Sequence, residues 1–173
     1  MNLPFVSRPD ATIRHAIAED ASRLADIYNP YVLTTTVTFE ESAIGPADMA
    51  ARIAEAADAR LPFLVAVVAG STVAFASASR WKGRCAYRYS AETTVYVMQG
   101  HWQRGLGRAL YSTLLDLLQR SGCHAAIGGI ALPNEPSVRL HERLGFEQVA
   151  RFREVGFKFD RWIDVGYWQR LLT

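Results

Sequence analysis

The sequence predicts an α/β fold, in which a mixed central β-sheet is flanked by helices. Short apolar or β-branched runs alternate along the chain with segments of helical periodicity, which is typical of this class. The chain has 173 residues, 50% of them hydrophobic, which is enough for one substantial core and short for two. We therefore expect a single domain over residues 1–173, with its core at about residues 12–171.

Two helices are expected in the first third of the chain. Residues 1–13 form a frayed lead-in, and a short strand covers Thr12 to His15. The following segment begins with acidic residues and spaces its apolar residues as in a helix, which we expect to end near Pro30. Thr34 to Phe39 then forms a loop expected to face the substrate. Pro46 lies in the first turn of the second helix.

A hairpin and a central strand are expected next. Phe63 to Val68 and Thr72 to Ser79 flank Ala69-Gly70-Ser71, which is a turn signal between two antiparallel strands. Basic and aromatic residues fill Trp81 to Arg88, and Ala91 to Val97 has the composition of a further strand. The basic and aromatic segment therefore lies just before the central strand.

Helices and strands alternate in the remainder of the chain. The segment from Gly107 to Ser121 spaces its leucines along one helical stripe, and Gly122 is suited to end that helix. A strand is then expected at Ala125 to Ala131, a shorter helix at Asn134 to Leu144, and two closing strands at Glu147 to Val155 and Trp162 to Leu171.

Charge and cysteine content argue against several classes of protein. With 19 basic and 17 acidic residues the net charge is +2, and no basic run occurs, so we expect neither nucleic acid nor a membrane as partner. Cys85 and Cys123 form no CxxC pair, which fits a reducing compartment, and we expect a cytoplasmic protein. The first 13 residues lack the apolar stretch of a signal or anchor. The histidines lack the spacing of a zinc site, so no metal is expected.

The strongest functional signal is the segment from Val95 to Arg108, where a strand leads through a glycine-containing loop into a helix. Main-chain amides left unpaired at a helix N-terminus bind phosphate oxygens, and Gly105 and Gly107 let a ligand approach them closely. Arg104 and Arg108 add positive charge. From the glycines alone, a tight turn without a ligand is an equal alternative.

Two other phosphate-binding motifs are excluded by the parts that this loop lacks. It has no Gly-Lys-Ser/Thr ending, which a nucleotide-hydrolysing enzyme needs. The dinucleotide fingerprint also fails, because Leu110 replaces its third small residue and the loop after Val97 is too long. A pyrophosphate-bearing ligand that is not hydrolysed remains.

Two segments resemble the cofactor segments of the GCN5-related N-acetyltransferase (GNAT) superfamily. Residues 102–107, Trp-Gln-Arg-Gly-Leu-Gly, match the pattern Gln/Arg-x-x-Gly-x-Gly/Ala, except that Trp102 stands in the first position. Residues 134–146 match Asn-x-x-Ser/Ala-x-x-x-Tyr/His with a following Gly-Phe, and helical spacing places Asn134, Ser137 and His141 on one face. By themselves, Asn134 could be an ordinary N-cap and His141 a core histidine. The resemblance implies a GNAT fold and acetyl-CoA as co-substrate, bound by Val95, Tyr96, Val97, Trp102, Gln103, Arg104, Gly105, Leu106, Gly107, Arg108, Asn134 and Ser137.

Within this superfamily, nearly the whole chain resembles the phosphinothricin and methionine sulfoximine N-acetyltransferases. The segments that carry the resemblance are Trp81 to Val97, Leu132 to Glu142, Gly156 to Lys158 and Trp162 to Trp168. It implies acetylation of the α-amino group of a small amino-acid-like acceptor, and a homodimer with its sites near the interface.

The resemblance implies that Glu92 is the general base. An ammonium ion cannot attack a thioester until a base removes a proton, and a carboxylate on the central strand suits that task. Strand alternation places Glu92, Thr94 and Tyr96 on one face and Val95 and Val97 on the other. Main-chain amides around Val95 to Val97 would hold the pantetheine and polarise the acetyl carbonyl. From the sequence alone, Glu92 could equally be a structural ion-pair partner.

Further roles follow from the same resemblance. His141 either is catalytic, by assisting proton transfer or protonating the leaving CoA thiolate, or positions the cofactor. Lys82, Arg84 and Tyr87 match the family residues that bind the anionic groups of the acceptor. The alternative is that they form a basic turn exposed to solvent. Weaker matches to pocket-lining positions are Phe39, Tyr111 and Val165.

Two rival functions remain open at this point. A protein N-terminal acetyltransferase would need an open peptide groove rather than a small cluster of anion-binding residues. A non-catalytic acetyl-CoA-binding sensor would keep the glycine loop but would not depend on Glu92.

Overall fold

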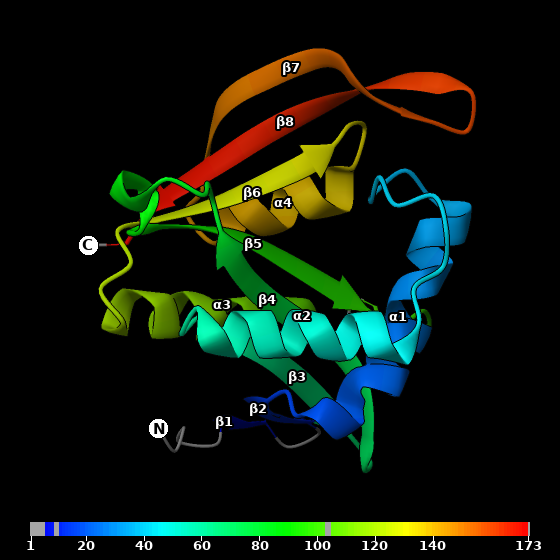
Figure 1. Cartoon of the computed structure of the whole chain (residues 1–173), viewed down its shortest axis with the longest axis vertical. Helices are drawn as coiled ribbons and strands as arrows, with labels where there is room; N and C mark the ends of the chain where they lie inside the picture. Colours follow the sequence, from blue (N-terminus) through cyan, green and yellow to red (C-terminus); the bar gives the residue numbers. More distant parts are fainter. Residues whose placement is uncertain (1–5, 9–10, 103–104, 173) are drawn as a thin grey trace.

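The computed structural model describes residues 6–8, 11–102 and 105–172. Within these residues eight strands form one sheet, in the order β1-β2-β3-β4-β5-β6-β8-β7 (Figure 1). The core clusters show that α1 and α2 pack on one face of the sheet and α3 and α4 on the other. The elements are β1 (Val6–Arg8), β2 (Ala11–His15), η1 (Ala18–Asp20), α1 (Ala21–Thr34), α2 (Pro46–Asp58), β3 (Phe63–Val68), β4 (Ser71–Arg80), η2 (Cys85–Tyr87), β5 (Ser90–Val97), α3 (Leu106–Arg120), β6 (Ala125–Ala131), α4 (Glu135–Arg143), β7 (Glu147–Lys158) and β8 (Arg161–Leu171).

The predicted mixed α/β class is confirmed, because β5 and β6 are parallel and the other neighbouring strands are antiparallel. The hairpin of β3 and β4 turns at Ala69 and Gly70, both with positive φ, as its turn signal predicted. Helix α3 buries the predicted leucine stripe, including Leu110, Leu114 and Leu118. Gly122, with φ of 83°, follows this helix in the left-handed conformation that favours glycine.

The prediction was wrong at three places. Residues 6–8, taken as part of a frayed lead-in, form β1 and pair with β2. Helix α1 does not end near Pro30 but runs on to Thr34, because Val32 beyond the proline is fully buried in the core and the Thr34 hydroxyl bonds back to the Pro30 carbonyl at 2.7 Å. Strand β7 continues past Val155 to Lys158, since its ladder with β8 resumes at Gly156.

The sheet opens between β5 and β6. These strands pair over only three positions, the last being Glu92 with Ile127, and then spread apart toward their C-terminal ends (Figure 1). Strand β5 stays paired with β4 as far as Val97. The result is a fork in the sheet, with Glu92 at its apex.

The fork leaves one main-chain edge of β5 without a strand neighbour. The Met98 amide donates to the Val73 carbonyl of β4 at 2.8 Å. Because successive residues of a strand direct their polar main-chain groups to opposite neighbours, those of Val95 and Val97 face away from β4 and into the fork. The side chains follow the predicted alternation, since Tyr96 packs with the cluster under α1 and α2, whereas Val95 and Val97 pack with the cluster under α3.

In the described part of the chain, no helix combines the length and apolar character that crossing a membrane requires.

Candidate active site

A cleft of about 700 Å³ occupies the fork and the start of α3 and α4. Its walls come from the end of β5, the loop before α3, the end of β6 and the first turns of α4. Predicted ligand-binding residues in its lining are Val95, Tyr96, Val97, Trp102, Gly105, Leu106, Gly107, Arg108, Asn134, Ser137 and His141. Gln103 and Arg104, which were also predicted to bind the cofactor, lie outside the described residues.

The start of α3 lines this cleft with main-chain amides that lie outside the helical hydrogen-bond ladder. Gly105 is the N-cap of α3 with φ of 71°, a left-handed conformation that suits glycine. The first i to i−4 hydrogen bond of the helix runs from the Ala109 amide to the Gly105 carbonyl at 3.0 Å. The amides of residues 106–108 therefore come before the regular hydrogen bonds of the helix. A Cβ on Gly107 would lie 3.4 Å from Val97 Cγ2, so glycine also allows the helix to approach β5 closely.

Trp102 has a different role from the polar residue that the motif usually carries. Its indole Nε1 donates to the Val97 carbonyl at 2.9 Å and lies 3.1 Å from the Tyr31 hydroxyl, which bonds to the same carbonyl. The indole N–H is therefore engaged by the end of β5. What Trp102 offers to the cleft is an aromatic surface that is about half exposed.

Helix α4 supplies the opposite wall. The Asn134 side chain accepts a hydrogen bond from the Ser137 amide at 3.3 Å, so Asn134 is an N-cap as well as a lining residue. Arg139 and Arg143 line the same cleft and were not singled out from the sequence. Their spacing of four residues, which places both on one helical face, is the signal that could have identified them.

The donors around the cleft fit a ligand with a pyrophosphate. The glycine loop contributes amides, and Arg108, Arg139 and Arg143 contribute positive charge. His101 lines the cleft too, and its Nδ1 is buried without a hydrogen-bond partner in the described structure. A buried polar atom without a partner is costly, so a ligand group that bonds to it would stabilise the complex. Among the described residues, no group of three His, Cys, Asp or Glu side chains could hold a metal ion.

A second cavity, of about 470 Å³, opens on the other face of the sheet. It shares Val37 and Gly129 with the cleft, so the two spaces meet at the fork. Its lining is mainly apolar, with one carboxylate and one phenol as its ionisable groups. The lining residues are Val37, Phe39, Glu92, Gly129, Ala131, Val155, Gly156, Phe157, Val165 and Tyr167.

Glu92 lies where the two cavities meet. Its Oε1 is 3.4 Å from the position that a Cβ would take on Gly129, so the absence of a side chain there keeps space open beside the carboxylate. Burial raises the pKa of Glu92, and the positive charge of Lys82 partly opposes that rise. Burial and the charge of Glu92 together raise the pKa of Tyr167. A carboxylate whose pKa is raised is a stronger base than an ordinary glutamate.

The structure separates the predicted acceptor-binding residues into two groups. Phe39 and Val165 line the second cavity. Lys82, Arg84 and Tyr87 are exposed on the segment around η2 and do not line that cavity. Lys82 nevertheless lies close enough for its charge to lower the pKa of Glu92.

Tyr111, the third of the weaker pocket-lining matches, packs inside the protein. This residue is fully buried on α3, beside the leucine stripe that faces the sheet, and its hydroxyl bonds to Thr93 and His141. It therefore contacts neither cavity as a lining residue.

His141 is 4% exposed and lies at the base of the cleft. Its Nδ1 is 2.8 Å from the Ser137 carbonyl and its Nε2 is 3.0 Å from the Tyr111 hydroxyl. Burial lowers the pKa of His141, with the Ser137 contact acting in the opposite direction. The imidazole is therefore neutral near pH 7.

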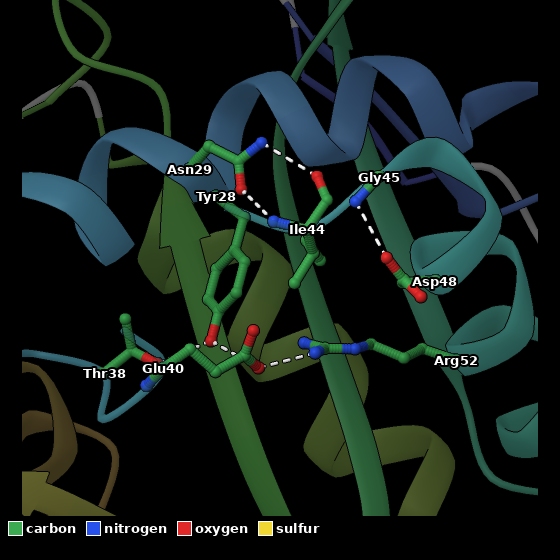
Figure 2. Close-up of polar contacts among 8 residues, drawn as sticks. All are labelled: Tyr28, Asn29, Thr38, Glu40, Ile44, Gly45, Asp48 and Arg52. Atoms are coloured by element: carbon green, nitrogen blue, oxygen red, sulfur yellow. Dashed lines mark hydrogen bonds and ion pairs between the residues drawn. The ribbon is translucent and has the colours of Figure 1, made fainter. Parts of the chain in front are cut away.

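The loop between α1 and α2, residues 35–45, covers the second cavity and is held by hydrogen bonds along its length (Figure 2). The Tyr28 hydroxyl lies 2.5 Å from Thr38 Oγ1, and Glu40 accepts from Tyr28 and from Arg52. Near α2, the Asn29 side chain bonds to both the amide and the carbonyl of Ile44. The loop predicted to face the substrate is therefore a fixed wall.

Lys158 holds the same loop from the other side. Lys158 is 2% exposed, and its ammonium donates to the Val32 carbonyl at 2.6 Å and to the Thr38 carbonyl at 2.8 Å. Burial lowers the pKa of Lys158, opposed by the charges of Glu41 and Glu40. The end of β7 is thus tied to the last turn of α1 and to the cavity wall.

Comparison with known proteins finds acetyltransferases as relatives of this chain. The acetyltransferase (GNAT) domain model matches residues 13–166. A phosphinothricin N-acetyltransferase from Streptomyces viridochromogenes is 41% identical over 94% of this chain and 88% of its own length. An L-methionine sulfoximine/L-methionine sulfone acetyltransferase from Salmonella typhimurium is 35% identical over 91% of this chain and 92% of its own.

A solved structure supports the same assignment. A GNAT superfamily phosphinothricin acetyltransferase from Sinorhizobium meliloti, in complex with acetyl-CoA, superposes with a TM-score of 0.90 at 33% identity. The match covers 94% of this chain and 88% of that one. The predicted GNAT fold is confirmed, and the chain belongs to the acetyltransferase (GNAT) domain family.

Proposed function

We propose that this acetyltransferase transfers the acetyl group of acetyl-CoA to the α-amino group of a small amino-acid-like acceptor, of the phosphinothricin or methionine sulfoximine type. The observation that carries the proposal is the position of Glu92, a half-buried carboxylate at the junction of the two cavities. The names of the relatives, and the acetyl-CoA bound to the Sinorhizobium meliloti enzyme, support the choice of substrates.

The cleft is proposed to hold acetyl-CoA, which supplies the activated acetyl group. The amides of residues 106–108, with Arg108, Arg139 and Arg143, would bind the phosphates. The main-chain groups of Val95 and the amide of Val97, which face into the fork, would hold the pantetheine amides and polarise the acetyl carbonyl. The Val97 carbonyl is already bonded to Trp102 and Tyr31.

Glu92 is proposed as the general base. It accepts a proton from the acceptor ammonium, directly or through water, and the amine lone pair then forms a bond to the acetyl carbon. The bond from that carbon to sulfur breaks, and CoA leaves as the thiolate. The attacking nitrogen then loses its second proton, to solvent or to the thiolate, which leaves the neutral amide. Because both substrates meet at the fork, transfer is direct and needs no covalent enzyme intermediate.

The acceptor is proposed to occupy the second cavity. The volume of about 470 Å³, walled by the fixed loop 35–45 and by β7, favours a small molecule over a peptide. Phe39 and Val165 would contact its side chain. Lys82, whose charge reaches Glu92, is proposed to bind an anionic group of the acceptor, together with Arg84 and Tyr87 on the same segment.

We also propose that the enzyme acts as a homodimer in the cytoplasm. Strand β7 is an edge of the sheet and exposes four large apolar side chains. A long exposed apolar edge strand is typical of an interface. The two cysteines are free, which fits a reducing compartment. Exposed apolar residues of the β7–β8 hairpin are Val149, Phe152, Val155, Phe157, Phe159 and Trp162.

A steady-state screen tests the proposed reaction. CoA release is followed with phosphinothricin, methionine sulfoximine, methionine sulfone, free amino acids and short peptides as acceptors. Glu92→Gln should lower kcat by on the order of a hundredfold or more while the Kd for acetyl-CoA stays nearly unchanged. Equal turnover by the variant would contradict the base assignment. A preference for peptides would indicate an N-terminal acetyltransferase, and tight acetyl-CoA binding without turnover of any amine would indicate a sensor.

A further inference from the structure

Three buried side chains meet at the point where β5 and β6 separate. The last main-chain pair is Glu92 with Ile127, and the next residues along the two strands are Thr93 and Gly128. Thr93 and Gly128 are both reached by side chains from the helices behind the sheet: Tyr111 of α3 bonds to Thr93, and His141 of α4 lies over Gly128. Elements far apart in the sequence are therefore joined at the apex of the fork.

The contacts form one continuous chain. Thr93 Oγ1 lies 2.6 Å from the Tyr111 hydroxyl and 3.2 Å from the Ile127 carbonyl of β6. The Tyr111 hydroxyl lies 3.0 Å from His141 Nε2, and His141 Nδ1 lies 2.8 Å from the Ser137 carbonyl. Thr93, Tyr111 and His141 are all less than 5% exposed. Side-chain bonds thus connect β5 to β6, α3 and α4 immediately beyond the last main-chain pair.

Gly128 is part of this arrangement. A Cβ on Gly128 would overlap the imidazole of His141, so the ring lies directly on the main chain of β6. The ring also packs edge-on against Tyr111 and Phe146, with centroid distances of 5.2 and 5.1 Å. The position of β6 at the fork is therefore fixed by contact with His141.

The direction of the hydrogen bonds can be assigned. The Ser137 carbonyl only accepts, so His141 Nδ1 carries the proton and Nε2 of the neutral ring is an acceptor. The Tyr111 hydroxyl must then donate to Nε2, and Thr93 must donate its single proton to Tyr111. The Ile127 carbonyl, at 3.2 Å, shares that proton only as the weaker branch of a bifurcated bond. The Nε2 lone pair of His141 is engaged by a buried phenol, and this nitrogen has no proton to give.

We propose that Thr93, Tyr111 and His141 act as a fork clamp, a set of positioning residues that fixes the opening between β5 and β6 and so places the reacting acetyl group. The inference rests on the proposed binding of acetyl-CoA in the fork. It gives His141 a positioning role in place of proton donation to the leaving thiolate. Small displacements of a reacting group strongly lower rates, so the clamp acts mainly on kcat.

The test compares variants of the clamp with matched variants elsewhere. Thr93→Val and Tyr111→Phe each remove one hydroxyl, and Thr113→Val and Tyr89→Phe are the controls. We expect each clamp variant to lower kcat about tenfold while the Kd for CoA changes less than twofold, because the phosphate-binding amides are untouched. The double variant should lose little more than either single variant, since the chain acts as a unit. Thr93→Ser, which keeps the hydroxyl, should restore kcat.

Readouts beyond activity separate positioning from simple destabilisation and from acid catalysis. All rates are measured well below the Tm of each variant, and the pH dependence of kcat should keep its shape in both clamp variants. The nitrogen-15 spectrum of the wild type should show His141 protonated at Nδ1. The proposal is overturned if Thr93→Val and Tyr111→Phe keep kcat within twofold while His141→Gln loses turnover together with the alkaline limb of the pH profile.

A failure of the proposed reaction can be distinguished from a failure of the fork clamp. If the wild type acetylates no acceptor, the acceptor assignment fails, and the clamp is judged by binding alone. The ratio of the Kd values for acetyl-CoA and CoA reports the placement of the acetyl group. A ratio changed at least threefold by Thr93→Val and restored by Thr93→Ser supports the clamp, and an unchanged ratio contradicts it.

Discussion

The ring of Phe39 lies directly against the main chain of Gly156, so that a Cβ on this glycine would overlap the ring. Both residues line the proposed acceptor cavity. Gly156→Ala should displace Phe39 and raise the KM for the acceptor by about tenfold, with little change in the KM for acetyl-CoA. Steady-state kinetics with each substrate varied in turn measure both values. Gly83→Ala, at a position with no neighbour within 4 Å, is the matched control and should change neither.

The acid side of the pH profile should report Glu92. Burial raises the pKa of this carboxyl, so kcat/KM for the acceptor should fall as the pH drops through a value above that of an ordinary glutamate. Lys82→Met removes the charge that opposes the rise, so the acid limb should move to higher pH. Arg88→Met removes a charge from the same segment as a control and should leave the limb in place. A limb that does not move with Lys82→Met would contradict the electrostatic coupling.

Arg139 and Arg143 should contribute to binding of the co-substrate. Both line the cleft with Arg108, and charged hydrogen bonds to phosphate are among the stronger polar contacts. Replacing either by Ala should raise the Kd for acetyl-CoA by about tenfold and weaken its dependence on salt. Isothermal titration at two salt concentrations measures this. The control, Arg120→Ala at the other end of α3, should bind acetyl-CoA as the wild type does. If the Arg139 and Arg143 variants also bind with the wild-type Kd, these two arginines do not belong to the site.

Lys158 should contribute to stability as well as to the site. Lys158→Met keeps most of the volume but leaves the buried carbonyls of Val32 and Thr38 without their donor. We expect the free energy of unfolding to fall by about 2–3 kcal/mol, as for other buried polar groups that lose a partner. Urea denaturation measures the change, and Arg153→Met on the exposed part of β7 is the control. A loss below 0.5 kcal/mol, on the order of a surface substitution, would show that the two bonds do not hold the loop.

The exposed apolar residues of the β7–β8 hairpin should control the oligomeric state. Trp162 is 62% exposed and Val149 is 57% exposed on the hairpin that we propose as the dimer interface. Replacing both by Glu should convert a dimer to a monomer, because it introduces charge into an apolar contact. Light scattering coupled to size-exclusion chromatography measures the mass. Leu33→Glu, an equally exposed position on α1, should leave the mass unchanged.

Much of this fold follows from local sequence patterns, because each pattern is confined to a few neighbouring residues. The leucine stripe of α3, the turn at Ala69 and Gly70, and the glycine loop before α3 are examples. Helix α1 shows the limit of such patterns. Pro30 is a stop signal, but burial of Val32 outweighs it, and that burial depends on distant segments.

The candidate site shows the same limit. The glycine loop could be predicted from its own residues, and Glu92 was proposed as the base through the family resemblance of its segment. The fork, in contrast, depends on where the pairing of β5 and β6 ends. The contacts of Tyr111 with Thr93 and His141 depend in the same way on how α3 packs on the sheet. Lys158 lies in one of the segments that carry the family resemblance, but nothing in its neighbourhood predicts that it contacts residues more than a hundred positions earlier.

Strand β7 connects the proposed dimer contact with the acceptor cavity, so enzyme concentration should affect acceptor binding. Its outer surface is the proposed subunit contact, while Gly156 and Lys158 on the same strand support Phe39 and the loop 35–45 over the acceptor. Linkage then requires the two equilibria to depend on each other: if association orders this strand, acceptor affinity rises with enzyme concentration, and saturating acceptor strengthens association by the same factor.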